Sequence, residues 1–597
     1  MISHSRGRWA PFWVSLTFAA VFILLRIIYR LVFGSFSWQA IGQAASLAVP
    51  FALVIVVCGF LSALVDVRKL LPAMSALRYG RSIGTALAIA LSSYPTLIHQ
   101  VKQLGTARTL RGVRSRTAFL VPLLEHTIER AVALAAAMDL RGFGAGKPAS
   151  VNDSTSIELD HFTLRYGNKT VLNDVTLTIP AGEITVLTGQ TGSGKTAVLE
   201  SIAGLSQHFH NGHTTGTLTV GVVDRNLTPP RLTAGLIGYV AQDVRLSFAA
   251  ATAREELEFG LRVSGHTTAE ASNRAEELIA QFSLESFADQ PIEILSAGEA
   301  TRVAIAAALS LHPRILLLDE PLADLDRDSR ADLVTLLAEL QTSEQLTIVM
   351  AEHHTSELER LTPQWLSVSS GEVCSGQWGS DVDTLPARSL PVVGSDEIFQ
   401  VQDISVVQGS RELVQDVSLS LHVGEMLAIT GANGVGKSSL LHALAATAPS
   451  QNIFRLVPEN VSSLFITETL EEELSRADSL AGHKHSGLTA MTFWSILATE
   501  ESPELLSVHP RDLSAGTQVA LAIALQLAWK PQVVLIDEPT RGLDAISREA
   551  MAEVLRCVAE TGTAVLYASH DEAFVADLGC RVLAIREGAL VPDEVTA

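Results

Sequence analysis

The sequence predicts an α-helical membrane and coupling domain followed by two α/β domains, each built around a phosphate-binding loop. Three observations lead to this prediction. The N-terminal part contains two long apolar runs. The motif G-x-x-x-x-G-K-[ST] occurs at 189–196 and again at 431–438. Each copy is followed at similar spacing by the same later motifs, which indicates an internal repeat behind a different N-terminal part.

Both glycine-rich loops have the composition of a nucleotide phosphate site. Glycines let backbone N–H groups approach phosphate oxygens, the lysine reaches the β- and γ-phosphates, and the last hydroxyl is a ligand for Mg²⁺. The first loop consists of Gly189, Gln190, Thr191, Gly192, Ser193, Gly194, Lys195 and Thr196. The second consists of Gly431, Ala432, Asn433, Gly434, Val435, Gly436, Lys437 and Ser438. Two loops predict two ATP sites, each with Mg²⁺ as cofactor.

Three further motifs follow each loop in the same order. The segment L-S-A-G lies at 295–298 and at 513–516, and 23 residues separate each serine from the aspartate of a later D-E-P motif. The aliphatic runs before these aspartates predict strands buried on both faces of a parallel sheet. A histidine comes 34 or 33 residues after the aspartate. The residues are Asp319, Glu320 and His353 in the first repeat, and Asp537, Glu538 and His570 in the second.

This ordered double set resembles the ATP-binding cassette (ABC) family, with its Walker A, signature, Walker B and switch-histidine motifs. The resemblance implies two α/β P-loop ABC ATPase domains at 157–378 and 398–597, joined by a linker at 379–397 that is rich in Pro, Gly, Ser and Asp. It also implies head-to-tail pairing, in which each ATP lies between the Walker motifs of one domain and the signature of the other. The completing residues are Ser514 and Gly516 for the first site, and Ser296 and Gly298 for the second.

The resemblance also implies a role for each motif in hydrolysis. An aspartate holds Mg²⁺ through water, and the following glutamate positions or deprotonates the attacking water. The expected catalytic residues are Glu320, His353, Gln242, Glu538 and His570. The expected Mg²⁺ ligands are Thr196, Asp319, Ser438 and Asp537.

The two repeats differ at two positions of the same site. Tyr166 lies 29 residues before its Walker A lysine, where the family places an aromatic ring that stacks on adenine, whereas Gln408 has that spacing in the second repeat. Gln242 has the spacing of the family's Q-loop glutamine, and Glu459 replaces it in the second repeat. The interval from the lysine to this position shortens from 47 to 22 residues, which predicts a loss of peripheral strands. A weaker second site is expected, with neutral drift as the alternative explanation.

Residues 1–148 are expected to form the helical membrane and coupling domain. Apolar runs at 11–33 and 41–65 are each long enough to cross a bilayer, and the basic residues that flank the pair favour a cytoplasmic N-terminus. A stretch at 82–101, and one at 117–138 that contains Glu125, Glu129 and Arg130, predict partly buried or surface-lying helices instead of spans. Two further crossings are the alternative, which the basic segment 102–116 opposes.

The motif A-x-x-x-R-G occurs twice, at 107–112 and 137–142. An arginine in the last helical turn followed by glycine suits a helix C-terminus, and this is also the purely structural interpretation. The repeat resembles the paired motifs of the T component of energy-coupling factor (ECF) importers, whose helices dock on an ATPase. The resemblance implies that Arg111 and Arg141 are coupling residues.

The combined resemblance implies the ATP-hydrolysing module of an ECF-type importer of a micronutrient, either a vitamin or a metal ion. The expected partners are a separate membrane S component, the lipid bilayer and an additional membrane subunit. The expected location is the plasma membrane, with both ATPase domains cytoplasmic. Residues 1–150 carry a net charge of +12 and the remainder −33, which argues against a nucleic-acid partner. The alternatives are an exporter-type ABC transporter and a twin-cassette ABC ATPase with a non-transport role.

Overall fold

The computed structural model describes the chain as two separate units, 1–94 and 95–597. The described residues are 10–33, 46, 48–57, 101, 105, 120–144, 155–376, 394, 396–408, 411–447, 453–592, without the single positions 324, 354 and 485. Three predicted features lie outside these residues: most of the linker, the first A-x-x-x-R-G motif with Arg111, and the stretch 82–101 except its last residue.

The N-terminal unit contains helix α2 (Ala10–Phe33) and a helical stretch at 48–57. The rings of Phe22 and Phe51 lie 6.4 Å apart, centroid to centroid, so the two segments touch. Large apolar side chains of this unit, Trp13 and Phe18 among them, are exposed. No helix in the described part of the chain combines the length and the apolar character needed to cross a membrane. The predicted integral location in the plasma membrane, and with it the predicted helical membrane domain, is therefore corrected.

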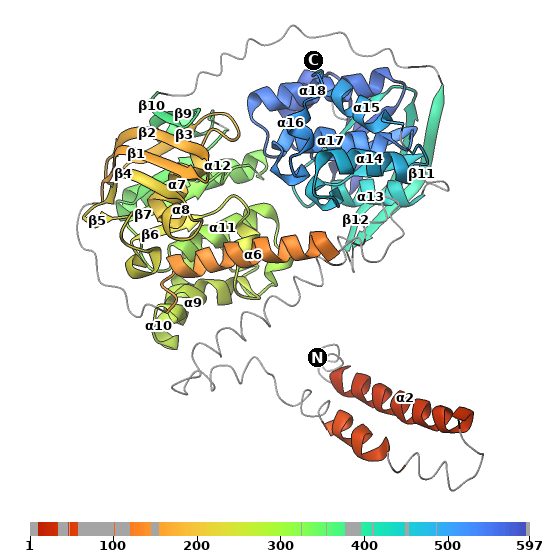
Figure 1. Cartoon of the computed structure of the whole chain (residues 1–597), viewed down its shortest axis with the longest axis horizontal. Coiled ribbons are helices and arrows are strands. Elements are labelled where there is room, and N and C mark those ends of the chain that lie inside the picture. Colours follow the sequence, from red (N-terminus) through yellow and green to blue (C-terminus); the bar gives the residue numbers. More distant parts are fainter. Residues whose placement is uncertain are drawn as a thin grey trace. The chain divides into compact units, whose positions relative to one another are not determined.

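The first α/β domain contains two sheets (Figure 1). A four-stranded antiparallel sheet has the order β2-β1-β4-β5, and a six-stranded, mostly parallel sheet has the order β10-β9-β3-β8-β7-β6. The strands are β1 (Ile157–Tyr166), β2 (Lys169–Ile179), β3 (Ile184–Thr188), β4 (His213–Val220), β5 (Val223–Asp224), β6 (Ile237–Val240), β7 (Ile315–Asp319), β8 (Thr347–Ala351), β9 (Gln364–Ser369) and β10 (Glu372–Ser375). The helices are α7 (Lys195–Ala203), α8 (Leu205–His208), α9 (Ala253–Val263), α10 (Thr268–Gln281), α11 (Ala297–Ala308) and α12 (Arg327–Glu344), with 3₁₀ turns η1 (Pro230–Thr233), η2 (Val244–Ser247), η3 (Ile292–Ile294) and η4 (Leu358–Leu361).

The second domain repeats this plan with fewer strands. A two-stranded sheet β11-β12 accompanies a six-stranded sheet of order β14-β15-β16-β13-β17-β18. The strands are β11 (Glu397–Gln408), β12 (Arg411–His422), β13 (Met426–Thr430), β14 (Phe454–Val457), β15 (Val533–Asp537), β16 (Ala564–Ala568), β17 (Arg581–Arg586) and β18 (Ala589–Pro592). The helices are α13 (Lys437–Thr447), α14 (Leu470–Leu480), α15 (Leu488–Ile496), α16 (Pro503–Leu506), α17 (Ala515–Leu527), α18 (Ala545–Glu560) and α19 (Glu572–Leu578), with η5 (Val461–Leu464) and η6 (Pro510–Asp512).

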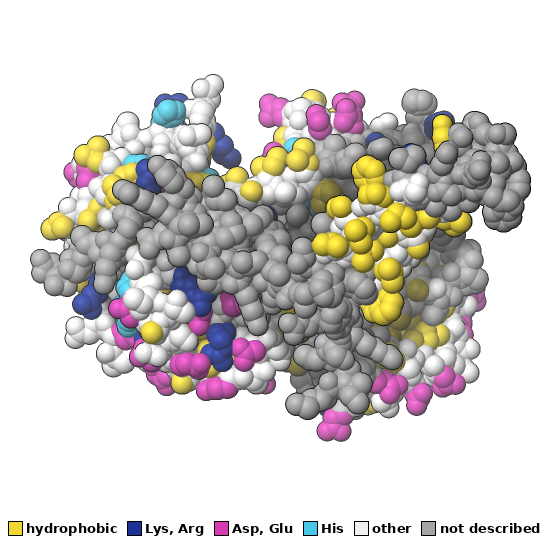
Figure 2. All heavy atoms as spheres, turned by 90° about the horizontal axis from the view of Figure 1, so that it is seen from below, with side chains coloured by type: hydrophobic (Ala, Val, Ile, Leu, Met, Phe, Trp, Pro, Cys, Tyr) yellow, Lys and Arg dark blue, Asp and Glu magenta, His cyan; other side chains and the backbone are white. Residues whose placement is uncertain are grey.

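The shorter second domain lacks counterparts of β4 and β5 among its described residues, as the 22-residue interval predicted. The strands before the D-E-P motifs, β7 and β15, are buried at every residue and lie between parallel neighbours. Both predictions are confirmed. The acidic composition is visible as magenta side chains over the surface in Figure 2.

Helix α6 (Leu120–Leu140) packs on the first domain and corresponds to the stretch predicted at 117–138. It contacts η1, η2 and β6, and Ala136 and Leu140 belong to the apolar core of that domain (Figure 1). Leu124, Ile128 and Val132 stay exposed at a spacing of four residues, so an apolar stripe remains on the helix. The prediction of a partly buried helix is confirmed.

Candidate functional site

Each phosphate loop connects a buried strand to the first turn of a helix. The first loop joins β3 to α7 and the second joins β13 to α13, so that each Walker A lysine is the first residue of its helix. Gly189 has a φ of 152°, and a Cβ there would lie 2.2 Å from the carbonyl oxygen of Val368. Only glycine fits this approach, which leaves loop N–H groups available for a phosphate.

The two Walker A lysines make the same contacts within their own loops. Lys195 Nζ donates to the carbonyl oxygens of Gly189 at 2.9 Å and Gln190 at 3.1 Å. Lys437 makes the equivalent contacts in its own loop at 2.7 and 3.2 Å. Burial lowers the pKa of both ammonium groups, and neighbouring carboxylates oppose this shift. A cationic group is therefore held at the mouth of each loop.

A hydroxyl and a carboxylate lie side by side beneath each loop. Thr196 Oγ1 donates to Asp319 Oδ1 at 3.2 Å, and Ser438 Oγ donates to Asp537 Oδ1 at 3.0 Å. Burial raises the pKa of each aspartate to about 7. Hard oxygen ligands of this kind suit Mg²⁺, which takes one or two protein ligands and completes its shell with water and phosphates. The predicted metal ligands thus fit the cofactor.

The predicted catalytic residues of the first domain form one connected network. Gln242 Nε2 donates to Glu320 Oε2 at 2.7 Å, and His353 Nε2 lies 3.1 Å from Glu320 Oε1. The same histidine nitrogen lies 3.2 Å from Lys195 Nζ. Glu320 has a φ of 49°, a conformation that non-glycine residues adopt mainly where the surrounding structure holds them. The carboxylate of Glu320 is thus fixed from two sides.

The second domain keeps part of this network. His570 Nδ1 lies 2.9 Å from Glu538 Oε2, Lys437 Nζ lies 3.8 Å from Glu538 Oε1, and Glu538 has a φ of 51°. Glu459, however, forms an ion pair of 2.6 Å with Arg541. Arg541 was not predicted from the sequence, although the contrast between D-E-P-T-R in the second repeat and D-E-P-L-A in the first is a usable signal.

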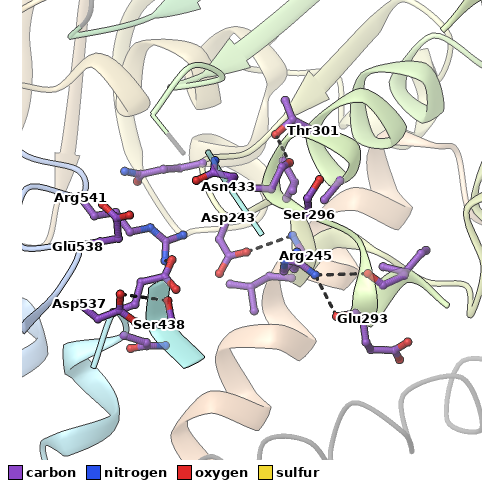
Figure 3. A pocket seen from close by; sticks show the side chains of 18 of the residues that line it. Asp243, Arg245, Glu293, Ser296, Thr301, Asn433, Ser438, Asp537, Glu538 and Arg541 are labelled. Atoms are coloured by element: carbon purple, nitrogen blue, oxygen red, sulfur yellow. Dashed lines mark hydrogen bonds and ion pairs between the residues drawn. The ribbon is translucent and has the colours of Figure 1, made fainter. Parts of the chain in front are cut away.

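A cavity of about 870 Å³ joins the two domains at the second site. Its lining includes Lys437, Ser438, Asp537 and Glu538 from the second domain and Ser296 from the first. Figure 3 shows Ser438, Asp537 and Glu538 on one side and Ser296 with Arg245 on the other. Ser296 caps α11 through a hydrogen bond from Glu299 N, so the positive end of this helix faces the cavity. The head-to-tail arrangement predicted for this site is present.

Two aspartates that were not predicted from the sequence link the domains reciprocally. Asp544 Oδ2 accepts from Thr191 N of the first loop at 2.8 Å, and Asp326 Oδ2 accepts from Asn433 N of the second loop at 3.3 Å. Each aspartate uses its other oxygen to cap its own helix, α18 or α12. Each lies seven residues after the Walker B aspartate, a shared spacing that was a usable signal.

The second signature lies next to one of these aspartates. A Cβ added at Gly516 would lie 3.6 Å from Ser547 Cβ, and Ser547 N donates to Asp544. Ser514 caps α17 through Thr517 N, as Ser296 does in α11. The N-terminus of α17 therefore lies beside Asp544, the residue that accepts a hydrogen bond from Thr191 of the first loop.

The comparisons with known proteins support the same assignment. Residues 172–323 and 414–541 match the family described as "ABC transporter". The chain carries two ABC-type ATPase domains. A putative ABC transporter ATP-binding protein of Streptomyces avermitilis is 29% identical over 71% of this chain and 90% of its own length. One of Treponema denticola is 26% identical over 71% and 93%. Among solved structures, a chain of the ribosome-bound archaeal Pelota and ABCE1 assembly aligns with 73% of this chain and with 79% of its own length. The two chains are 20% identical and superpose with a TM-score of 0.51, so they are similar in fold.

The predicted adenine-stacking position is equivalent in the two ATPase domains. Tyr166 is the last residue of β1 and pairs with Lys169 across the hairpin, and Gln408 is the last residue of β11 and pairs with Arg411. Tyr166 is half-buried against the core of the first domain, and burial raises the pKa of its hydroxyl. Stacking on adenine stays a prediction.

One predicted coupling arginine is among the described residues. Arg141 Nη1 lies 2.7 Å from Glu256 Oε1 on α9, and Glu256 is fully buried. The other oxygen of Glu256 accepts from Ala249 N and Ala250 N, both at 2.8 Å. Gly142, with a φ of 77°, ends the helix. This copy of the A-x-x-x-R-G motif thus ends a helix at its glycine and places its arginine in an ion pair with the first ATPase domain, and a coupling role for Arg141 stays a prediction.

Proposed function

We propose that this chain is an ATP-driven motor in which helix α6 transmits closure of the two ATPase domains to a partner protein. The observation that carries the proposal is that α6 contacts both domains. Near one end, Arg141 pairs with buried Glu256 of the first domain. Near the other, Glu125 Oε2 lies 2.6 Å from Arg511 Nη1 of the second, three residues before signature Ser514.

Helix α6 also borders the nucleotide cavity itself. His126, Glu129 and Arg130 line the cavity that contains the second Walker set and Ser296. A change in the separation of the two ATPase domains acts on a helix held at both ends. Its stripe of Leu124, Ile128 and Val132 is available to a partner, since these side chains are exposed. The attachment to both ATPase domains and the exposed stripe both suit a helix that transmits movement of these domains to a partner.

The first candidate for the driven process is uptake by an ECF-type importer. In it the partner is a separate S component that binds a vitamin or a metal ion. The A-x-x-x-R-G resemblance and the naming of the relatives as putative ABC transporter ATP-binding proteins support this candidate.

The second candidate is a twin-cassette ABC ATPase with a non-transport role. The ribosome-bound assembly that aligns with 73% of this chain contains a protein of similar fold, and the comparisons agree better with this candidate than with the importer. The low identity means that the ribosome is not carried over as a partner.

The test is to isolate the full chain with its bound proteins and measure ATPase activity with and without them. An S-component-like partner should stimulate the wild type and fail to stimulate Arg141→Lys, because lysine lacks the planar fork of arginine. The Arg254→Ala variant, which removes two ion pairs of the same helix α9, to Glu276 and Asp289, is the matched control. Co-purification with ribosomal particles that stimulate the ATPase would support the second candidate. Equal stimulation of wild type and Arg141→Lys by any partner would contradict the role of α6.

A further inference from the structure

The position of Glu459 in the second site is structurally the position of Gln242 in the first. Strand β6 pairs in parallel with the Walker B strand β7, and β14 pairs in parallel with β15. Each residue lies two positions beyond the end of its strand. The two side chains therefore start from the same place relative to the Walker B aspartate, and the change from amide to carboxylate is a change within one site.

The contacts of these two side chains differ. Gln242 donates to the catalytic Glu320 at 2.7 Å. A carboxylate at this position has no proton to donate, and facing Glu538 it would place two negative charges together. Glu459 instead accepts from Arg541 Nη1 at 2.6 Å.

Arg541 occupies a turn that the two domains share. Its N–H donates to Glu538 O at 3.2 Å, as Ala323 N–H donates to Glu320 O at 3.2 Å in the first domain. The backbone hydrogen bond of this turn is thus the same in both domains. The side chain differs, since the first domain has the methyl group of Ala323 where the second has the guanidinium group of Arg541. Figure 3 shows Arg541 on the same side of the large cavity as Glu538. It also lines a smaller cavity with Glu320 and His353 of the first domain.

The carboxylate of Glu459 creates an electrostatic problem for nucleotide binding. Glu459, Lys437, Ser438 and Asp537 line one cavity, so an unpaired carboxylate would lie in the space that must receive a polyanion. Mg²⁺ and the lysine offset the charge of the phosphates, but not an additional fixed negative charge. A guanidinium at hydrogen-bond distance provides this compensation.

We propose that Arg541 is a positioning residue of the second site, which neutralises Glu459 and turns it away from Glu538 so that this site accepts Mg²⁺–ATP. Glu459 and Arg541 occupy the positions that Gln242 and Ala323 occupy in the first site. The inference concerns ATP binding alone and does not depend on which process the ATPase drives.

The test measures binding at the second site of the full chain in a Lys195→Ala background, which disables the first site. The probe is Mg²⁺ with a non-hydrolysable ATP analogue in an equilibrium titration. Arg541→Ala should weaken binding about tenfold, a typical coupling for paired charges. Glu459→Gln alone should bind at least as tightly as the parent. The double variant Arg541→Ala, Glu459→Gln should return to within about twofold of the parent, because the charge that needs compensation is gone.

Two further variants make the outcome specific. Arg541→Lys keeps the charge and should bind within about threefold of the parent, and it also serves if the alanine variant fails to fold. Arg556→Ala removes an arginine of α18 that contacts Glu553 and Asp577 and lines neither cavity, and it should leave binding unchanged. The proposal is overturned if Arg541→Ala binds like the parent, if the double variant is as weak as Arg541→Ala, or if Arg541→Lys is as weak as alanine.

Discussion

The two ATPase domains share the groups that are predicted to contact the phosphates and differ in the groups around them. In both, a lysine lies at the loop, a hydroxyl bonds to a buried aspartate, and a glutamate in a left-handed conformation contacts a histidine. Only the first has a neutral amide on its catalytic glutamate. The second has a charged pair, Glu459 with Arg541, beside the equivalent glutamate.

The place of this difference is instructive. The groups that the two domains share follow strands inside each sheet, where every residue is buried between neighbours. Gln242 and Glu459 follow β6 and β14, which are the edge strands of their sheets. A substitution at an edge changes one contact and leaves the packing of the core intact. The two sites therefore differ beside the edge strands and not beside the buried central strands.

The largest expected effect concerns the catalytic glutamates. Glu320→Gln should lower ATPase activity by about 10²- to 10⁴-fold, the usual value of a general base. Glu538→Gln should leave a larger residual activity, because the first site retains the full network of Gln242, His353 and Lys195. Turnover of both variants checks this. Equal losses, or a greater loss from Glu538→Gln, would remove the distinction between the sites.

The next effect concerns the adenine. An aromatic side chain stacked on a base contributes about 1–3 kcal/mol, so Gln408→Tyr should tighten the weaker site by that amount. Equilibrium titration of a hydrolysis-blocked chain should resolve two classes of site in the parent and more similar affinities in the variant. Tyr166→Gln is the matched control and should weaken the other class. A single class of ATP site, with an affinity that neither substitution changes, would contradict the predicted difference between the two sites.

A smaller effect should follow when the first site is converted toward the second. Gln242→Glu removes the amide donor to Glu320 and adds a like charge, and it should lower ATPase activity about tenfold, equivalent to about 1.4 kcal/mol. Adding Ala323→Arg should recover most of the loss, because the backbone turn matches that of Arg541. If the double variant is no better than Gln242→Glu, the compensation does not transfer between the domains.

The smallest effect concerns the end of α6 on the second domain. The Glu125–Arg511 pair is partly exposed, so removing it should cost less than about 1 kcal/mol. Losing the arginine of the Arg141–Glu256 pair should cost more, since the carboxyl group of Glu256 is fully buried and would lose its cationic partner. Thermal unfolding and hydrogen exchange of α6 in Glu125→Gln and Arg141→Ala measure the difference. A larger loss from Glu125→Gln would reverse the ranking of the two ends.

The sequence by itself determined the local chemistry of both ATP sites. Local sequence was enough to predict the glycine loops, the hydroxyl and aspartate beneath each loop, the glutamate after each Walker B strand, and the missing peripheral strands. Each of these features is set by the residues next to it in the chain and by the strand or helix that begins or ends there. The apolar runs gave a wrong location, because no helix in the described part of the chain has both the length and the apolar character that they predicted.

Only the tertiary structure decided which distant groups meet. Arg541 and Glu459 are 82 residues apart in sequence, Arg141 and Glu256 are 115 apart, and Thr191 and Asp544 are 353 apart. Charge alone gives each of these side chains many equally suitable partners. The choice among them is fixed by the packing of buried strands and helices, which brings specific loop ends within hydrogen-bond distance.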